Sequence, residues 1–336
     1  MSHPTDRFPS RRAALRQLGA LGLAAGGTAA FSGHALAQSA GDKPVRIVLP
    51  NAVSSGVDTI TRAAQTALAK ALGHPVVVEN QPGAGGVVGV QTLARAAPDG
   101  FTLGVVSNNV VIFPSVMKTL PFDLNTDVTP IAVCGYTPVV LVVNPKVPAA
   151  NSKEFTAWLK AKNGEANFGS GGNGTILHLA GEMYVDEVGA KARHIPYKGV
   201  GPMLTDLIGG QIEFATAALP SVQQHLKTGA LRAIGIATSQ RVAAAPEIPT
   251  FVEQGVPGYV VEAWFAVLGP KGLPAAEVKR INAAVATAFA DPGVMEAMAK
   301  QGNVINVSTP DKAQAFFKDE LVKYARLVKK AGIEAQ

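Results

Sequence analysis

Cysteine, charged residues and aromatic residues are all infrequent in this sequence. One cysteine, Cys134, occurs in 336 residues, so no intrachain disulfide can form. Its apolar neighbours predict a small buried core residue. Charged residues make up 16% of the chain and aromatic residues 6%. Low charge together with abundant Ala and Val predicts a packed core rather than a disordered chain.

Basic tracts of the kind that bind nucleic acid are also missing. The formal net charge is +6, but the first 37 residues hold four Arg and one Asp. Residues 38–336 therefore carry 26 basic and 23 acidic side chains, a net charge of +3. The densest basic cluster in this part is the pair Lys329-Lys330. This composition predicts no nucleic acid partner.

The first 37 residues are predicted to form a signal peptide. Four Arg precede an uncharged run at 18–31, and Ala35-Leu36-Ala37 offers the small residues of a cleavage site. The run is shorter than the roughly 20 apolar residues that span a bilayer. No cysteine lies near the cleavage site, which argues against a lipoprotein. We expect a soluble periplasmic product, exported by the Sec route or, because Ser10-Arg11-Arg12 loosely resembles its signal, the twin-arginine route.

Short β-branched runs alternate with helical patterns, which predicts βαβ units and a parallel sheet. A first series has strands near 45–49, 76–79 and 102–106 and helices near 58–72 and 87–96. A second series follows Pro145, with helices near 153–162, 176–188 and 202–208 and strands near 167, 194–197 and 212–216. A C-terminal helix is expected from Pro310, with Thr309 as its N-cap, to a stop at Gly332.

The length of the mature chain favours two domains. Apolar strands at 139–144 and 259–268 enclose the second series, and the C-terminal helix needs an earlier sheet to pack on. We therefore expect a discontinuous first domain at 38–141 and 264–336, with an inserted second domain at 142–263. The two apolar strands would cross between the domains and act as a hinge.

The stretch NFGSGGNGTILHL, residues 167–179, contains a literal G-x-G-x-x-G pattern at Gly169, Gly171 and Gly174. In a dinucleotide-binding unit the next strand ends in an acidic residue, whereas here it ends in Tyr197-Lys198. A lysine could receive a 2′-phosphate, so an exported dinucleotide-binding enzyme stays an alternative. A P-loop does not fit, because Thr175 stands where that motif requires Lys.

The same stretch suits an anion without any cofactor. Its glycines permit close backbone approach, and the helix that follows directs its first N–H groups at the loop. Similar strand-to-helix loops occur at residues 50–58, 81–86 and 106–109. Loops at the carboxyl ends of parallel strands face one crevice. We therefore expect these loops to converge on one anion site.

Patterns that would support a metal or catalysis are sparse. His178 and Glu182 lie four positions apart on one predicted helix, but no second His lies nearby in the sequence. The chain has neither an H-E-x-x-H motif nor a G-x-S-x-G elbow. We expect no metal, no cofactor and no catalysis, and His178 is interpreted as a structural or ligand-lining residue.

Nearly all of residues 44–330 resemble the Bug-type periplasmic receptors of tripartite tricarboxylate transporters. The matching stretches are VVVENQPGAGG, ARAAPDGFTLG, LPFDLNTDVTPIA, GSGGNGTILHLAGEMY, IPYKGVGPMLTDLIGGQIEFA, KTGALRAIGIAT, PEIPTFVEQGVPGY and WFAVLGPKGLP. The resemblance implies an α/β, two-domain periplasmic binding protein fold (Venus-flytrap, type II-like) with a ligand cleft between the domains. It implies a monomer that captures a small organic carboxylate (a dicarboxylate, acidic amino acid or aromatic acid) and delivers it to membrane permease subunits.

The resemblance also implies two loops that grip the carboxylate through backbone N–H groups, hydroxyls and waters. The first loop contributes Ser54, Ser55, Gly56 and Asp58, with Ser107 and Asn108 beside it. The second contributes Ser170, Gly171, Asn173, Gly174, Thr175 and His178, helped by Tyr197, Lys198, Gly199 and Asp206. A carboxylate in contact with an anionic ligand would repel it, so structural roles are expected for Asp58, Glu182 and Asp206.

This sequence departs from the family in its first loop. That loop usually has an apolar-Pro-Gly-Gly run before the Asp, whereas this chain has Ala52-Val53-Ser54-Ser55-Gly56. The identity of the ligand is therefore left open, and a sensor that signals to a membrane partner stays an alternative to a transport receptor. In either case, Gly174→Val is expected to abolish ligand binding and to leave folding intact.

Overall fold

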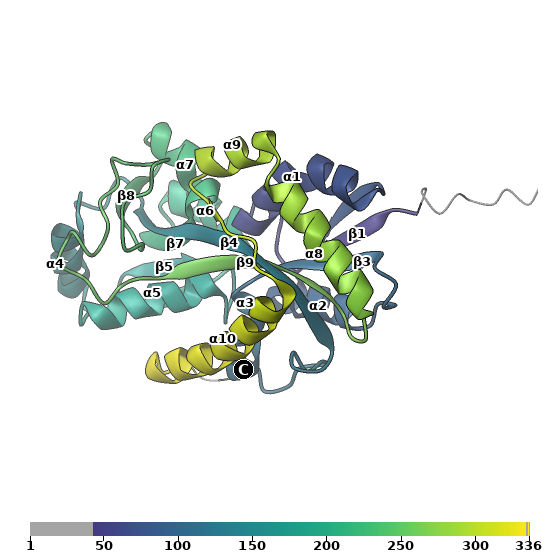
Figure 1. Cartoon of the computed structure of the whole chain (residues 1–336). Helices are drawn as coiled ribbons and strands as arrows, with labels where there is room; N and C mark the ends of the chain where they lie inside the picture. The colour runs from purple at the N-terminus through teal and green to yellow at the C-terminus, as the bar shows by residue number, and fades with distance from the viewer. Residues whose placement is uncertain (1–42, 334, 336) are drawn as a thin grey trace, which may run out of the picture. The chain divides into compact units, whose positions relative to one another are not determined.

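The computed structural model describes residues 43–333 and residue 335. The predicted signal peptide at 1–37 lies outside the described residues. Within the described part, ten strands form one mixed sheet in the order β2-β1-β3-β9-β4-β7-β5-β6, with β8 and β10 also pairing with β4. Figure 1 shows β4 and β9 running side by side through the middle of this arrangement.

The first half of the sheet is parallel, as predicted. The chain begins with β1 (Val45–Leu49), α1 (Gly56–Leu72), β2 (Val76–Asn80), the 3-10 turn η1 (Gly83–Gly86), α2 (Val87–Ala94), β3 (Thr102–Ser107) and α3 (Asn109–Val116). β1 lies between β2 and β3 and is parallel to both. Helix α1 begins where Ser55 Oγ accepts a hydrogen bond from the Asp58 N–H, and it ends at Gly73 with φ 74°.

The second half repeats this arrangement. Its elements are α4 (Ser152–Lys162), β5 (Asn167–Ser170), α5 (Ile176–Glu187), β6 (Arg193–Pro196), α6 (Val200–Gly209), β7 (Phe214–Ala218), α7 (Leu219–Lys227) and β8 (Arg232–Ile236). β5 lies between β6 and β7 and is parallel to both. The carboxyl ends of these strands therefore supply a second set of loops.

Strand β4 (Val128–Val143) connects the two halves. Residues 128–138 pair with β9 (Glu262–Pro270), and residues 139–143 pair with β7 and β8, in every case antiparallel. β9 also pairs antiparallel with β3. The sheet is thus mixed, which corrects the expectation of a parallel sheet. The predicted division into domains at 141/142 and 263/264 stays a prediction.

The elements that follow β9 in the sequence contact both β4 and the first helices of the chain. They are α8 (Ala275–Phe289), α9 (Pro292–Lys300), the short strand β10 (Val304–Ile305), which pairs with β4, and α10 (Pro310–Lys330). Helix α8 packs on α1, and α10 packs on α3 and β4. The helix predicted from Pro310 is therefore confirmed. The other predicted helices and strands match within a few residues, except that the strand predicted at 139–144 is the end of β4, which begins at Val128.

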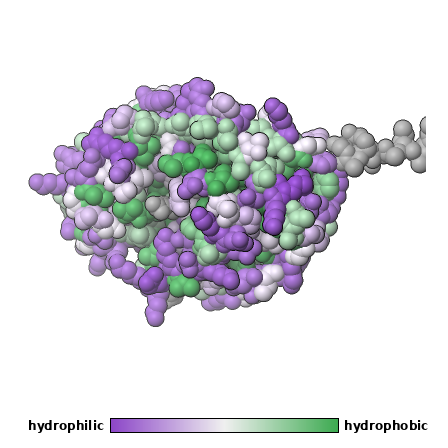
Figure 2. Space-filling view, in the orientation of Figure 1, coloured by the Kyte–Doolittle hydropathy of each residue, from purple (hydrophilic) through white to green (hydrophobic). Residues whose placement is uncertain are grey.

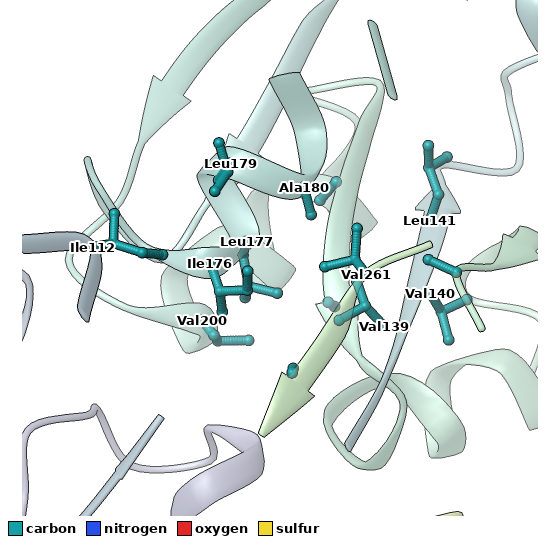
Figure 3. Packing of buried hydrophobic residues seen from close by; sticks show 14 of the residues in the cluster. Ile112, Val139, Val140, Leu141, Ile176, Leu177, Leu179, Ala180, Val200 and Val261 are labelled. Carbon is teal, nitrogen blue, oxygen red and sulfur yellow. The ribbon is translucent and has the colours of Figure 1, made fainter. Parts of the chain in front are cut away.

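Buried apolar residues pack against both the first and the second half of the sheet. Val139, Val140 and Leu141 of β4 lie beside Val261, with residues of α5 opposite them (Figure 3). Cys134 belongs to a second cluster beneath α1 and α8 and is fully buried, as predicted, and burial raises the pKa of its thiol to about 12. Hydrophilic residues cover most of the face in Figure 2, with hydrophobic residues in small separate patches. Among the helices of residues 43–333, none combines the length and apolar character needed to cross a membrane.

A buried polar cluster attaches α10 to the sheet. The Trp264 indole N–H donates to Glu320 Oε2 at 2.6 Å, and Lys323 Nζ lies 2.9 Å from Glu320 Oε1. Beside this pair, Asn108 accepts from the Trp264 backbone N–H at 2.8 Å and donates to the Tyr324 hydroxyl at 2.6 Å. Glu320 is 5% exposed, so its buried carboxylate oxygens depend on these donors as hydrogen-bond partners.

Glu320→Ala is expected to lower the free energy of unfolding by about 1–3 kcal/mol, because the buried indole N–H loses its acceptor. Glu320→Gln keeps a side-chain oxygen for the indole and should cost less. Urea denaturation followed by tryptophan fluorescence measures both changes. Lys323→Ala is the control, since loss of a half-exposed ion partner should cost less than about 1 kcal/mol. A Glu320→Ala variant as stable as the parent would contradict the anchoring role of Glu320.

Candidate ligand-binding site

A cavity of about 710 Å³ lies where loops from both halves of the sheet converge. Its wall is formed by the loops that follow β1, β2, β3, β5, β6 and β7, together with Thr137 of β4 and Ala263 and Trp264 of β9. The size falls within the roughly 300–1,000 Å³ of small-molecule sites. The convergence of loops expected from the sequence is therefore present in the structure.

Five helices begin at the wall of this cavity. The residues at or next to their N-termini that line it are Ser55, Gly56 and Val57 of α1, Asn109 of α3, Thr175, Ile176 and Leu177 of α5, Gly199 and Val200 of α6, and Ala218 and Ser221 of α7. A helix N-terminus carries partial positive charge and unpaired N–H groups. Among the described residues that line the cavity, Lys198 is the only charged one. The wall thus favours an anion and has no carboxylate to repel it.

Nine of the sixteen predicted site residues line the cavity: Ser55, Gly56, Ser107, Gly171, Asn173, Thr175, Tyr197, Lys198 and Gly199. The other seven are not among its lining residues: Ser54, Asp58, Asn108, Ser170, Gly174, His178 and Asp206. Most of these seven hold a lining residue or its loop in place through a hydrogen bond.

Asp58 supports the first loop (residues 50–58) from behind. Its carboxylate accepts from the Ser54 N–H at 3.0 Å and from Arg62 Nε at 2.8 Å. Asn80 Nδ2 donates to the same carboxylate at 2.9 Å. Ser54 has φ 67°, a conformation that costs a residue with a side chain roughly 1–2 kcal/mol. The contacts of Asp58 therefore fit the structural role expected for it.

The loop after β3 divides its polar residues between wall and interior. Ser107 lines the cavity, whereas Asn108 is fully buried and contacts Trp264 and Tyr324. The next residue, Asn109, lines the cavity, and its Oδ1 accepts from the Ile176 N–H of α5 at 2.8 Å. Asn109 lies in one of the loops expected to converge but was not among the predicted site residues, because only the folded chain brings it to α5.

The second loop (residues 170–175) is held by its own side chains. Ser170 Oγ accepts from the Gly172 N–H and donates to the Gly172 carbonyl, at 3.2 and 3.0 Å. Thr175 Oγ1 donates to the same carbonyl at 2.9 Å and caps α5 by accepting from the His178 N–H. Both hydroxyls are committed to the loop, so the loop faces a ligand with its backbone and with Asn173, which lines the cavity.

Two histidines lie directly behind the second loop. The rings of His178 and His194 stack with centroids 3.7 Å apart and planes 10° apart. His178 Nδ1 accepts from the Gly174 N–H at 3.2 Å, and His194 Nε2 lies 2.7 Å from Ser170 Oγ. Burial, and then the adjacent His178, lower the pKa of His194 to about 3. The expectation that His178 has no His neighbour is wrong, because parallel pairing of β5 with β6 brings His194 beside it.

Tyr197, Lys198 and Gly199 all line the cavity from the loop after β6. The Tyr197 hydroxyl donates to Asp206 Oδ2 at 2.8 Å. Burial, together with this hydrogen bond, raises the pKa of Tyr197 to about 12, so the phenol stays neutral. Asp206 does not line the cavity, and its contact with the Tyr197 hydroxyl orients that side chain. A structural role for this carboxylate stays a prediction.

The walls contributed by the two halves touch each other. Ser221 Oγ of α7 donates to the Ser54 carbonyl at 3.1 Å. Gly199 has φ 114°, and a Cβ at this position would lie 2.6 Å from Ala52 Cβ. A Cβ at Gly56 would lie 2.9 Å from Ala218 Cβ. The first loop therefore lies against the loops after β6 and β7, and small residues make this approach possible.

Relatives with known sequences match almost the whole chain. Residues 60–333 match the family described as the tripartite tricarboxylate transporter family receptor. The chain is also similar to the protein BugT of Bordetella pertussis, with 35% identity over 292 residues. That match covers 86% of this chain and 90% of BugT.

Solved structures of periplasmic binding proteins share the fold. The periplasmic binding protein BugD is 31% identical with a TM-score of 0.83, covering 87% of this chain and 99% of BugD. MatC of Rhodopseudomonas palustris with bound malate is 28% identical with a TM-score of 0.80, covering 85% and 98%. R. palustris Rpa4515 with adipate is 26% identical with a TM-score of 0.84, covering 87% and 98%. The α/β periplasmic binding protein fold is thus confirmed.

Gly171 and Gly174 differ in what a side chain would meet. A Cβ at Gly171 has its nearest neighbour, Val200 Cγ2, at 3.6 Å, and the backbone there is outside the left-handed region. A Cβ at Gly174 would overlap Val116 Cγ2, and φ there is 70°. A Val at Gly174 therefore strains the fold, which corrects the expectation that Gly174→Val leaves folding intact.

Gly171→Ala is expected to change the free energy of unfolding by less than about 0.5 kcal/mol while placing a methyl group in the cavity wall. Gly174→Ala should destabilise the protein by about 1–3 kcal/mol through overpacking and backbone strain. Urea denaturation of the two variants in parallel provides the comparison. Equal destabilisation by both substitutions would show that the second loop is not placed as described.

Proposed function

The chain belongs to the tripartite tricarboxylate transporter receptor family, and we propose that it is the receptor that captures a small carboxylate in the periplasm. In this proposal the signal at residues 1–37 directs export, and the loaded protein delivers its ligand to the membrane permease subunits of the transporter. The observation that carries the proposal is the cavity wall, which combines five helix N-termini with Lys198 and has no acidic side chain among the described lining residues. Such a wall stabilises a carboxylate.

The backbone of two helices is the proposed grip on the ligand. In the first turn of α5, the Ile176 N–H donates to Asn109 and the His178 N–H donates to Thr175, so we assign the Leu177 N–H to the ligand. In α1 the Asp58 N–H donates to Ser55, which leaves the N–H groups of Gly56 and Val57 for the opposite side of the cavity. Helix termini of this kind bind carboxylates as readily as phosphates.

We propose that the protein closes around its ligand by a hinge in β4 and β9. β4 changes its pairing partners between Pro138 and Val139, close to the predicted boundary at 141/142, and β9 begins at the predicted boundary 263/264. Domain 1 (38–141 and 264–336) and domain 2 (142–263) would then move as two bodies. A ligand that contacts both walls stabilises the closed state, since its affinity differs between the two states.

The solved neighbours support a carboxylate but do not decide which one. MatC binds malate and Rpa4515 binds adipate, two dicarboxylates of different length. In this chain the first loop reads Ala52-Val53-Ser54-Ser55-Gly56, and its departure from the family pattern alters one wall. The identity of the ligand is therefore best determined by a panel.

Thermal unfolding of the protein, freed of carried-over ligand by unfolding and refolding, tests the proposal. The panel contains malate, adipate, acidic amino acids, aromatic acids and nicotinamide nucleotides. A ligand at 100 times its Kd adds about 2.7 kcal/mol of stability and raises Tm by several degrees. We expect stabilisation by one class of carboxylate. Stabilisation by nucleotides alone would contradict the receptor and favour a dinucleotide-binding protein.

Lys198→Gln is expected to weaken carboxylate binding two- to five-fold at low salt, since Lys198 is an exposed charge at the wall. The difference should disappear between about 0.01 M and 1 M salt, as the Debye length falls from about 30 Å to about 3 Å. Titration calorimetry with the carboxylate that the panel selects measures both effects. Lys227→Gln, at an exposed position in the last turn of α7 and outside the wall, is the control and should leave affinity unchanged.

A further inference from the structure

Each histidine behind the second loop contacts that loop through one ring nitrogen. His178 Nδ1 accepts from the Gly174 N–H, which places the proton of the neutral ring on Nε2, 3.5 Å from Glu182 Oε1. His194 Nε2 lies 2.7 Å from Ser170 Oγ, and the tautomer of His194 sets which of the two atoms donates.

We propose that His178 and His194 are positioning residues that hold the backbone of the second loop in its binding geometry only while both rings are neutral. Each ring contacts one end of the loop: His194 fixes Ser170, which binds Gly172, and His178 fixes the Gly174 N–H. Neither ring lines the cavity. The consequence for ligand rests on the proposed function: carboxylate capture weakens as the pair takes up a proton.

Protonation opposes the present contacts in two ways. A proton on His178 Nδ1 turns the acceptor of the Gly174 N–H into a second donor. With both rings protonated, two positive charges would also face each other across a centroid separation of 3.7 Å. Phe168 of β5 packs against both rings and offers no counter-charge. These are the conditions that penalise the charged form of histidine.

Few charged groups face the pair. Glu182, on the same helix as His178, is the only charged residue among those described that forms an ion pair with either ring. From β5 the rings meet Phe168 and Ser170, and from β6 His194 itself is a member of the pair. Arg193 precedes His194 on β6, so its side chain points to the opposite face of the sheet. Glu182 is the one group that could favour a charged imidazole here.

The lowered pKa of His194 fixes the direction of the pH dependence. The unfolded chain, with an ordinary His pKa near 6.5, binds a proton before the folded protein does. Stability from this residue is therefore complete above about pH 6.5 and declines as the pH falls toward about 3. The order of the second loop is expected to decline in the same direction.

Substitutions can separate the hydrogen bond from the ionisable ring. In His178→Asn the amide oxygen can occupy the position of Nδ1 and accept from Gly174. In His194→Gln the amide nitrogen can occupy the position of Nε2 and donate to Ser170. Neither amide titrates. His178→Leu and His194→Leu keep apolar bulk and lose the hydrogen bond, so each pair of variants isolates one property.

The first experiment is an NMR titration of the whole protein with ¹⁵N-glycine and ¹³Cε1-histidine labels, from pH 8 downward. The amide signals of Gly172 and Gly174 are expected to shift with the same midpoints as the imidazoles of His178 and His194. The amide of Gly73, at the end of α1, is the internal control and should not follow them. In the double variant His178→Asn/His194→Gln, the two loop amides should lose this pH dependence.

The second experiment compares the affinities of the parent and the double variant His178→Asn/His194→Gln by titration calorimetry, at pH 8 and at the lowest pH at which circular dichroism shows both folded. Malate and adipate are the first probes, followed by the carboxylate that the panel selects. Both proteins lose affinity as the ligand itself takes up protons, so the quantity compared is the loss in each protein. The loss in the parent is expected to be at least three-fold larger than in the double variant, and at pH 8 the two proteins should bind within three-fold of each other. A Leu variant that folds by circular dichroism should bind at least ten-fold more weakly at both pH values.

The outcomes distinguish this inference from the proposed function. The positioning role would be overturned if the amide signals of Gly172 and Gly174 did not shift when the imidazoles titrate. It would also be overturned if those signals were the same in both Leu variants as in the parent. If the Leu variants do not fold, the titration of the parent and of the double variant still decides it. Amides that follow the imidazoles in a protein that binds no carboxylate would support the positioning role and overturn the receptor.

Discussion

The site depends on the pairing of β4 with two different sets of strands. Because β4 pairs with β9 over residues 128–138 and with β7 and β8 over 139–143, it joins two parallel βαβ units through antiparallel strands. The loops that leave the carboxyl ends of β1, β3, β5 and β6 are thereby brought to one cavity. Neither unit alone encloses that space. The antiparallel centre is thus the constraint that makes a shared site out of two repeated arrangements.

The electrostatics of the site come mostly from the backbone. Helix N-termini at the wall supply partial positive charge without the desolvation cost of a buried Arg or Lys. Acidic residues near the site do not oppose this field, because Asp58 and Asp206 lie behind the wall and are held by N–H and O–H donors of the protein. Exposed Lys198 adds an attraction that solvent and salt partly screen. The total attraction of the wall for an anion therefore stays moderate, which suits a receptor that must release its ligand.

Local patterns predicted most of the elements, whereas contacts between distant segments were beyond them. Strands such as β1 and helices such as α10 follow from periodicity and capping over a few residues. The antiparallel partners of β4 do not, because pairing depends on the global fold. His194 lies 16 positions from His178 in sequence, and the two rings stack because β6 pairs with β5 while α5 packs on β5. Asn109 likewise reaches α5 only through packing of distant segments.

The first loop shows how the chain reconciles an unusual sequence with the family's geometry. Ser54 adopts φ 67°, which glycine would adopt without steric cost, and the Asp58 carboxylate stabilises it by accepting its N–H. That acceptor belongs to the helix that follows the same loop, so the turn is shaped within one half of the sheet. The Ser54 carbonyl then accepts a hydrogen bond from the Ser221 hydroxyl, which belongs to the other half of the sheet. The local contact fixes the loop in any arrangement of the halves, whereas the contact with Ser221 exists only when the walls meet. A closing motion would therefore add contacts to a preformed loop instead of reshaping it, which keeps the entropic cost of closure small.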